Sequence, residues 1–138
     1  MKRKILTIIA VLVLILIPMS AYAESNEGIA PCYNVIARAD STICVVDDGI
    51  AYDMCVYVGS YDALDSAYIT TIVKRSSGTT VGTYSGYMTN HGGFFLYENT
   101  VDLNNKGVYH VEYTIRCYKN GAIVDTVSES TINVTYEP

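Results

Sequence analysis

The sequence contains no tryptophan, only three prolines and only two histidines among its 138 residues. Scarce proline permits long strands, because proline cannot donate a backbone hydrogen bond to a sheet. Beyond residue 23, no segment repeats apolar residues with the i, i+3, i+4, i+7 spacing of an amphipathic helix. Gly-x-Ser-x-Gly and Cys-x-x-Cys, which accompany a serine nucleophile and a zinc site, are also lacking. These absences favour an all-β protein, and we expect no catalytic, cofactor-binding or metal-binding residues.

Basic residues are few, nine against 14 acidic residues, and three of the nine form the cluster Lys2-Arg3-Lys4. The chain that follows residue 23 therefore carries six basic and 14 acidic residues, a net charge of −8. Such a charge repels nucleic acids and anionic membranes at long range. We therefore expect no nucleic-acid partner.

The amino-terminal residues have the three-part pattern of a secretory signal peptide. The basic cluster precedes an apolar run from Ile5 to Ile17, and Ala21-Tyr22-Ala23 places small residues where signal peptidase reads them. The run falls short of the ~20 residues that span a bilayer. We expect cleavage after Ala23, no stable membrane anchor after cleavage, and a secreted protein. Residues 24–31 are then a flexible leader, and residues 32–138 have the size of one domain.

The clearest strand pattern lies between residues 109 and 117. Apolar side chains alternate strictly with polar ones, and the apolar set is Tyr109, Val111, Tyr113, Ile115 and Cys117. Such alternation predicts a strand with one face in a core and one in water. Asn120-Gly121 then predicts a tight hairpin turn. In all, the pattern predicts seven strands, at residues 33–46, 50–59, 67–75, 79–88, 94–103, 109–117 and 123–136.

Turn residues separate these segments, so we predict an antiparallel β-sandwich. In the first segment, the odd-numbered side chains from Tyr33 to Val45 should face inward. In the segment 79–88, Gly82 and Gly86 indicate an edge strand or a bulge.

Gly107-Val108-Tyr109 follows an Asn-rich turn and resembles the tyrosine corner of immunoglobulin-like sandwiches, in which this tyrosine ties back to the preceding loop. Antibody domains have a disulfide cysteine where this chain has Val111, and a buried tryptophan that it lacks. The likeness is therefore to the broad immunoglobulin and fibronectin type III architecture. The signal peptide, Val73-Lys74-Arg75 at a strand end and the serine-rich last strand also resemble small, uncharacterised secreted β-sandwich proteins of Gram-positive bacteria. The resemblance implies an all-β, antiparallel immunoglobulin-like β-sandwich of about seven strands, and it carries no known activity.

Four cysteines follow the signal segment, and in an exported domain they predict two disulfide bonds with three possible pairings. Cys32 and Cys44 lie on one extended segment and cannot meet. In an immunoglobulin-like layout, Cys44 and Cys117 lie at opposite ends of the sandwich. We therefore expect Cys44–Cys55 and Cys32–Cys117. The alternative is four reduced, partly buried thiols.

Three kinds of side chain invite a functional interpretation. His110 faces outward beside Glu112, and without a supporting motif we interpret it as a surface histidine. Four loop aspartates could gather as a calcium site, although they lack the Asp-x-Asp-x-Asp-Gly spacing: Asp47, Asp48, Asp62 and Asp65. Tyrosine suits protein or carbohydrate recognition, and the tyrosines expected to face outward are Tyr57, Tyr61, Tyr84, Tyr87, Tyr97 and Tyr118.

Three functions stay open. The leading hypothesis is a secreted, non-enzymatic binding or interaction module without a cofactor, whose partner is a protein or glycan at the cell surface or outside the cell. The first alternative is a small extracellular enzyme or calcium-dependent module that uses the loop carboxylates and His91. The second is a structural accessory subunit of a surface assembly, in which the edge strand at residues 79–88 extends a partner's sheet.

Overall fold

The computed structural model describes residues 34–60 and 62–138, and this part of the chain forms two antiparallel β-sheets and no helix. Its strands are β1 (Ile36–Val46), β2 (Gly49–Val58), β3 (Ser66–Arg75), β4 (Thr80–Tyr87), β5 (Thr89–Asn90), β6 (Phe94–Asp102), β7 (Gly107–Lys119), β8 (Ala122–Ser130) and β9 (Val134–Tyr136). The predicted all-β sandwich is confirmed. The predicted signal peptide, the leader and Cys32 lie outside the described residues. Within those residues, no helix is long and apolar enough to cross a membrane.

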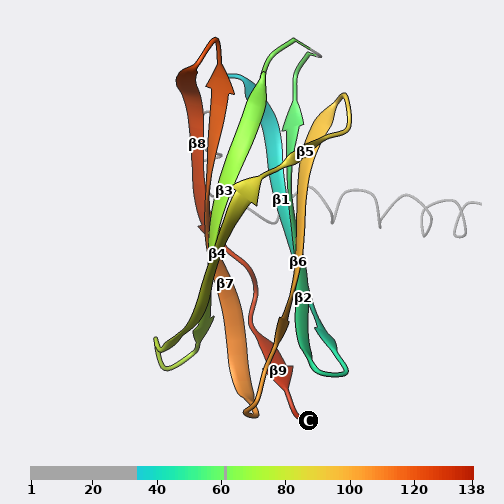
Figure 1. The fold of residues 1–138 in the computed structure, drawn as a ribbon, viewed down its shortest axis with the longest axis vertical. Coiled ribbons are helices and arrows are strands. Elements are labelled where there is room, and N and C mark those ends of the chain that lie inside the picture. Colours follow the sequence, from blue (N-terminus) through green and yellow to red (C-terminus); the bar gives the residue numbers. More distant parts are fainter. Residues whose placement is uncertain (1–33, 61) are drawn as a thin grey trace, which may run out of the picture. The chain divides into compact units, whose positions relative to one another are not determined.

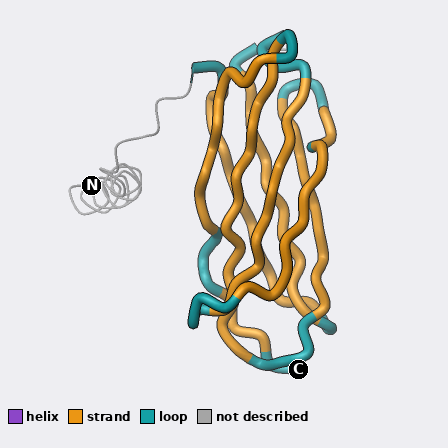
Figure 2. The backbone as a smooth tube through the Cα atoms, turned by 60° about the vertical axis from the view of Figure 1, so that its left-hand side comes forward, coloured by secondary structure: helices purple, strands orange, loops and turns teal. Residues whose placement is uncertain are grey.

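The strand order is that of an immunoglobulin-like sandwich. One sheet has the order β1-β2-β6-β5, and the other has the order β4-β3-β7-β8, with β9 paired to the beginning of β7. In chain order this is the A-B-E-D sheet facing the C-F-G sheet, with β4 as an additional edge strand beside the third strand. Figure 1 shows the two layers, and Figure 2 shows strands that run lengthwise with loops at both ends.

β7 is the central strand of the second sheet, between β3 and the pair β8 and β9. All five apolar side chains of its predicted inward face are buried. The hairpin turn after β7 is also confirmed, because Asn120 (φ 51°) and Gly121 (φ 77°) adopt the left-handed conformation that a two-residue turn requires. Burial stabilises side chains of this size by about 1.5–3 kcal/mol each. On the opposite sheet, Tyr52, Met54 and Val56 of β2 belong to the same hydrophobic core.

The predicted inward parity is wrong at the beginning of β1. Ile36 is buried and Ala37 is exposed. The register with β2 shifts between Ile36 and Arg38, and one extra residue in a strand reverses which side chains face the core. Beyond this bulge the prediction holds at Ile43, which is buried, and is wrong at Val45, which is 44% exposed.

The predicted last strand, residues 123–136, divides into β8 and β9 at residues 131–133. Thr131 lies at the break. Its N–H donates to the carbonyl of Val111 at 2.9 Å, and its Oγ1 accepts a hydrogen bond from the N–H of Val111 at 3.0 Å. The threonine side chain therefore provides a hydrogen-bond acceptor for the backbone N–H of Val111 in β7, where the ladder between β7 and β8 is interrupted.

Asp125 of β8 is a buried carboxylate that holds the first strand of the other sheet. Its oxygens accept hydrogen bonds from the backbone N–H groups of Asn34 (2.9 Å), Val35 (2.6 Å) and Ile36 (3.0 Å). Hydrogen bonds to a charged group stabilise by about 1.5–3 kcal/mol each. The sequence does not reveal this contact, because an aspartate within a strand ordinarily predicts a solvent-facing position.

Tyr109 makes the contact that the tyrosine corner implies. Its hydroxyl donates to the carbonyl of Asn105 at 2.5 Å and accepts a hydrogen bond from Arg75 Nε at 3.2 Å. The guanidinium of Arg75 also lies 5.5 Å from the centre of the ring. These contacts attach the loop between β6 and β7 to the end of β3.

Candidate functional site

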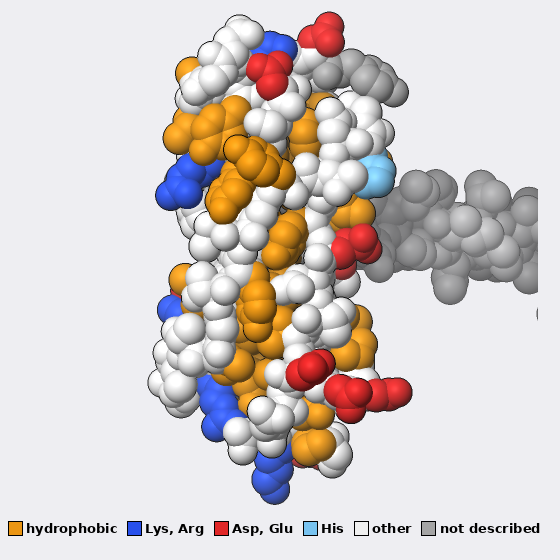
Figure 3. Space-filling model, in the orientation of Figure 1, with side chains coloured by type: hydrophobic (Ala, Val, Ile, Leu, Met, Phe, Trp, Pro, Cys, Tyr) orange, Lys and Arg blue, Asp and Glu red, His pale blue; other side chains and the backbone are white. Residues whose placement is uncertain are grey.

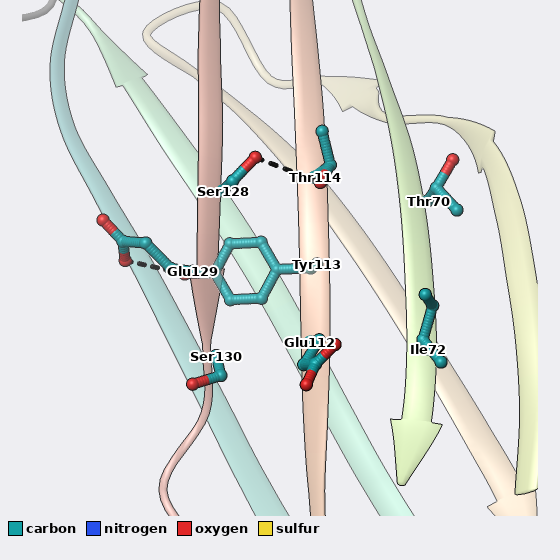
Figure 4. Close-up of a pocket in the computed structure, with 8 residues that line it drawn as sticks. All are labelled: Thr70, Ile72, Glu112, Tyr113, Thr114, Ser128, Glu129 and Ser130. Atoms are coloured by element: carbon teal, nitrogen blue, oxygen red, sulfur yellow. Dashed lines mark hydrogen bonds between the residues drawn. The ribbon is translucent and has the colours of Figure 1, made fainter. Parts of the chain in front are cut away.

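An open groove crosses the outer face of the second sheet, over β3, β7 and β8 (Figure 4). Its volume is about 370 Å³, and seven of its eight lining residues carry a hydroxyl or carboxyl group. The lining residues are Thr70, Ile72, Glu112, Tyr113, Thr114, Ser128, Glu129 and Ser130. Small-molecule pockets are mostly apolar and enclosed, so this groove suits a polar segment of a larger ligand.

Strand register arranges the groove as two rows across the sheet. The first row is Thr70, Thr114 and Ser128, and the second is Ile72, Glu112 and Ser130. The rows stand side by side because residues two apart on a strand share a face. Thr114 Oγ1 and Ser128 Oγ are hydrogen-bonded at 3.1 Å. On the core-facing side of the same strands, the hydroxyl of the buried Tyr113 donates to Glu129 Oε2 at 3.0 Å.

Glu112 places a negative charge in the middle of the second row. Lys74 Nζ lies 2.7 Å from its Oε2, and His110 Nε2 lies 3.7 Å from its Oε1. The hydrogen bond from Lys74 is the main cause that lowers the pKa of Glu112 below its ordinary value. The carboxylate is therefore ionised at neutral pH and presents an acceptor to the groove.

His110 lies beside Glu112 as predicted, but it is half-buried. A catalytic histidine of a Ser-His-Asp triad has a carboxylate on one ring nitrogen and a serine on the other. Among the described residues, Nδ1 of His110 is buried without a hydrogen-bond partner, and Nε2 is 3.7 Å from Glu112. The described residues therefore do not assemble a triad around this histidine.

The loop aspartates of the calcium hypothesis are not brought together. Asp47 and Asp48 form the turn between β1 and β2, near β9, because Tyr136 donates a hydrogen bond to the carbonyl of Asp47. Asp65 lies at the other end of β7, where it accepts hydrogen bonds from Lys119 Nζ (3.0 Å) and the N–H of Asn120 (2.5 Å). Among the described residues, no group of three or more His, Cys, Asp or Glu side chains could hold a metal ion.

His91 belongs to an aromatic row on the outer face of the first sheet. Its ring stacks on Phe94 at 4.9 Å, and Phe94 lies 5.8 Å from Tyr57. The guanidinium of Arg38 covers the other end of the row, 4.3 Å from the centre of the Tyr57 ring. These groups contact one another, so they stabilise the sheet surface.

Two of the tyrosines predicted to face outward face inward instead. Tyr84 and Tyr97 are half-buried and pack against the core. They border a buried polar cluster in which the Tyr52 hydroxyl bonds Thr71 Oγ1 (2.7 Å) and accepts from Asn99 Nδ2 (2.9 Å). Burial is the main cause that raises the pKa of Tyr52.

The other predicted tyrosines have different outcomes. Tyr87 is 72% exposed, which confirms the prediction there. Tyr57 and Tyr118 are half-buried, and Tyr61 lies outside the described residues.

The predicted Cys44–Cys55 disulfide is wrong. The turn of Asp47 and Asp48 sets Val46 opposite Gly49, so Cys44 lies opposite Ala51 and Cys55 lies opposite Asp40. Four residues of strand separate the two cysteines by about 13 Å, beyond the ~7 Å that a disulfide can join. Cys44, Cys55 and Cys117 form no disulfide among the described residues. Burial raises the pKa of the Cys117 thiol to about 12. The Cys32–Cys117 bond stays a prediction, because Cys32 lies outside the described residues.

Comparison with known proteins adds structural neighbours only. No family model matches the sequence, and no curated protein matches it. A β-glucuronidase of Bacteroides uniformis superimposes with a TM-score of 0.43 at 19% identity, over 67% of this chain and 12% of that chain. Bacteroides uniformis β-glucuronidase 2, bound covalently to cyclophellitol-6-carboxylate aziridine, superimposes with a TM-score of 0.41 over the same shares. The chain thus spans a small part of these enzymes.

Proposed function

We propose that this chain is a secreted, non-enzymatic binding module that holds a polar segment of an extracellular protein in the groove over β3, β7 and β8. The observation that carries the proposal is the pair of cross-strand rows, which present hydroxyl groups and the ionised Glu112 on one face. In this proposal the signal peptide at residues 1–23 exports the chain, as in the sandwich proteins of Gram-positive bacteria that the sequence resembles.

The chemistry of the groove favours a protein segment over a glycan. Backbone amides and side-chain donors can bond with Glu112, Ser128 and Ser130, and Ile72 offers one apolar contact. Glycan sites commonly offer an exposed aromatic face, whereas the aromatic ring at this groove, Tyr113, is 3% exposed. We therefore propose a protein segment as the ligand, and the experiment distinguishes it from a glycan.

The test is capture of surface proteins by the exported protein, with one variant in the groove and one matched control. Ser128→Arg fills the first row, and Thr100→Arg places the same side chain on the outer face of the other sheet; both positions are exposed strand residues. We expect Ser128→Arg to lose the captured protein and Thr100→Arg to retain it. Equal capture by both variants would contradict the proposal. Capture that survives protease treatment of the surface and ends with glycosidase treatment would show a glycan instead.

A structural accessory role is the second candidate function, because β4 is at the end of the second sheet and pairs only with β3 among the described residues. A free edge can pair with a strand of another chain.

A further inference from the structure

Among the described residues, five strands lie at the edges of the two sheets (β1, β5, β4, β8 and the three-residue β9), and they differ in how they resist pairing. β1 carries the ion pair Arg38–Asp40 and a bulge, and β5 is two residues long. β8 contains two acidic residues, and Asp125 among them binds the segment that leads into β1. Charges, bulges and short length are the devices that keep sheet edges from associating. β4 has no charged residue and is eight residues long, so it has neither charge nor short length to protect it. Its pairing with β3 is regular from Gly82 to Tyr87.

The neighbourhood of β4 in the sequence is also free of charge. Residues 76–90 contain no Asp, Glu, Lys or Arg, although the whole chain has a net charge of −5. Two copies of a negatively charged chain repel each other least where such an uncharged segment is in contact. In the space-filling view, hydrophobic side chains run along the face over which β4 passes, and charged side chains lie toward its margins (Figure 3).

Two large hydrophobic side chains of β4 are exposed, and they lie symmetrically about its middle. Val81 is 43% exposed and Tyr87 is 72% exposed, and both are three residues from Tyr84. When two identical strands pair antiparallel with Tyr84 opposite Tyr84, Val81 of each copy lies opposite Tyr87 of the other. Thr83 then lies opposite Ser85, so every outward pair is either apolar or hydroxyl-bearing.

We propose that the β4 edge is the dimer interface of this protein, in which β4 pairs antiparallel with β4 of a second copy. A two-fold axis perpendicular to the sheet relates the copies, so the interface closes on itself. Tyr87 already stands edge-on against Tyr68 of β3, with ring centres 5.1 Å apart. In the dimer, Val81 of the second copy covers the other side of Tyr87.

The dimer gives a continuous sheet of ten strands, five from each copy, and places both grooves on the same side. This arrangement would raise avidity for a ligand that repeats on a surface. The interface itself does not depend on the groove or on its ligand, and it is tested separately.

The test is the mass of the exported protein by sedimentation or light scattering across concentration, up to about 0.5 mM, because edge pairing buries little area and is weak. We expect a concentration-dependent dimer. In the double variant Val81→Lys/Tyr87→Lys, like charges lie opposite each other and we expect a monomer. In Val81→Lys/Tyr87→Glu, opposite charges lie across the axis and we expect the dimer to return.

Ile123→Lys is the matched control, because Ile123 is an exposed hydrophobic residue of the other edge strand, β8. We expect it to leave the dimer unchanged. A monomer at every concentration would overturn the proposal, as would a dimer that the two lysines leave intact or that Ile123→Lys disrupts. Failure of the charge-swapped variant to associate, with unchanged circular dichroism, would overturn the register.

Discussion

Asp125 accepts three backbone hydrogen bonds on one buried carboxylate, so its replacement measures how firmly the two sheets are joined. In Asp125→Asn the side chain keeps a single acceptor oxygen, so at least one of the three N–H groups loses its partner and faces an amide NH₂ instead. We expect the free energy of unfolding in urea to fall by about 1–3 kcal/mol. Asp102→Asn makes the same change of charge at an exposed strand end and should stay within about 0.5 kcal/mol of the parent. An equal loss of stability in both variants would mean that the lost charge, and not the loss of hydrogen bonds to Asp125, is responsible.

At the same scale, individual residues separate what the sequence can predict from what it cannot. The five inward side chains of β7 follow from alternation alone, because both neighbouring strands fix the strand in the sheet. The buried position of Ile36 cannot be predicted in this way, because one bulged residue reverses which side chains face the core, and the sequence contains no signal for that bulge. Tyr84 and Tyr97 have the same residue type as the exposed Tyr87, so only the packing of the opposite sheet distinguishes them.

At the scale of elements, the strands were predictable in number and order except for short ones. β5 has two residues and β9 has three, too few for an alternation to be recognised. Gly82 and Gly86 correctly predicted β4 as an edge strand. The groove was not predicted, because its rows join residues from three strands and exist only once the register is known. The disulfide error has the same origin, since the register of β1 with β2 depends on the length of a turn.

The segment that precedes β1 and the end of β7 are the elements that the second predicted disulfide joins. Asn34 donates to Asp125, and Asp125 lies opposite Cys117 in the sheet, so the chain two residues after Cys32 reaches the neighbour of Cys117. We expect mass spectrometry of the unreduced, alkylated protein to find Cys32 linked to Cys117 and Cys44 alkylated.

The stability of cysteine variants tests the same bond. Cys32→Ser should lower the free energy of unfolding by about 2–4 kcal/mol, because the open chain gains entropy when it unfolds. Cys44 is exposed, and Cys44→Ser should have little effect. Alkylation of Cys32 in the folded, unreduced protein would contradict the prediction.

At the scale of the whole molecule, exposed ion pairs connect the loops and the face of the second sheet. The hydrogen bonds from the N–H of Asn120 and from Lys119 lower the pKa of Asp65 below its ordinary value of 3.8. Lys74 does the same to Glu112, whose ordinary value is 4.5. Because the folded-state pKa values are depressed, the folded protein binds fewer protons than the unfolded chain at acidic pH. The contribution of both carboxylates is therefore present above the unfolded values and is lost as the pH falls through the folded ones.

We accordingly expect the melting temperature to be level between about pH 7 and pH 5 and to fall below about pH 4.5. Asp65→Asn/Glu112→Gln should flatten this fall, and the exposed pair Asp102→Asn/Glu98→Gln should leave it unchanged. Both carboxylates are in contact with solvent, so 0.5 M salt should reduce the difference between the two double variants. Parallel pH profiles at low salt for both double variants would show that other carboxylates determine the acid limit, and the ion pairs would then have no measurable part in it.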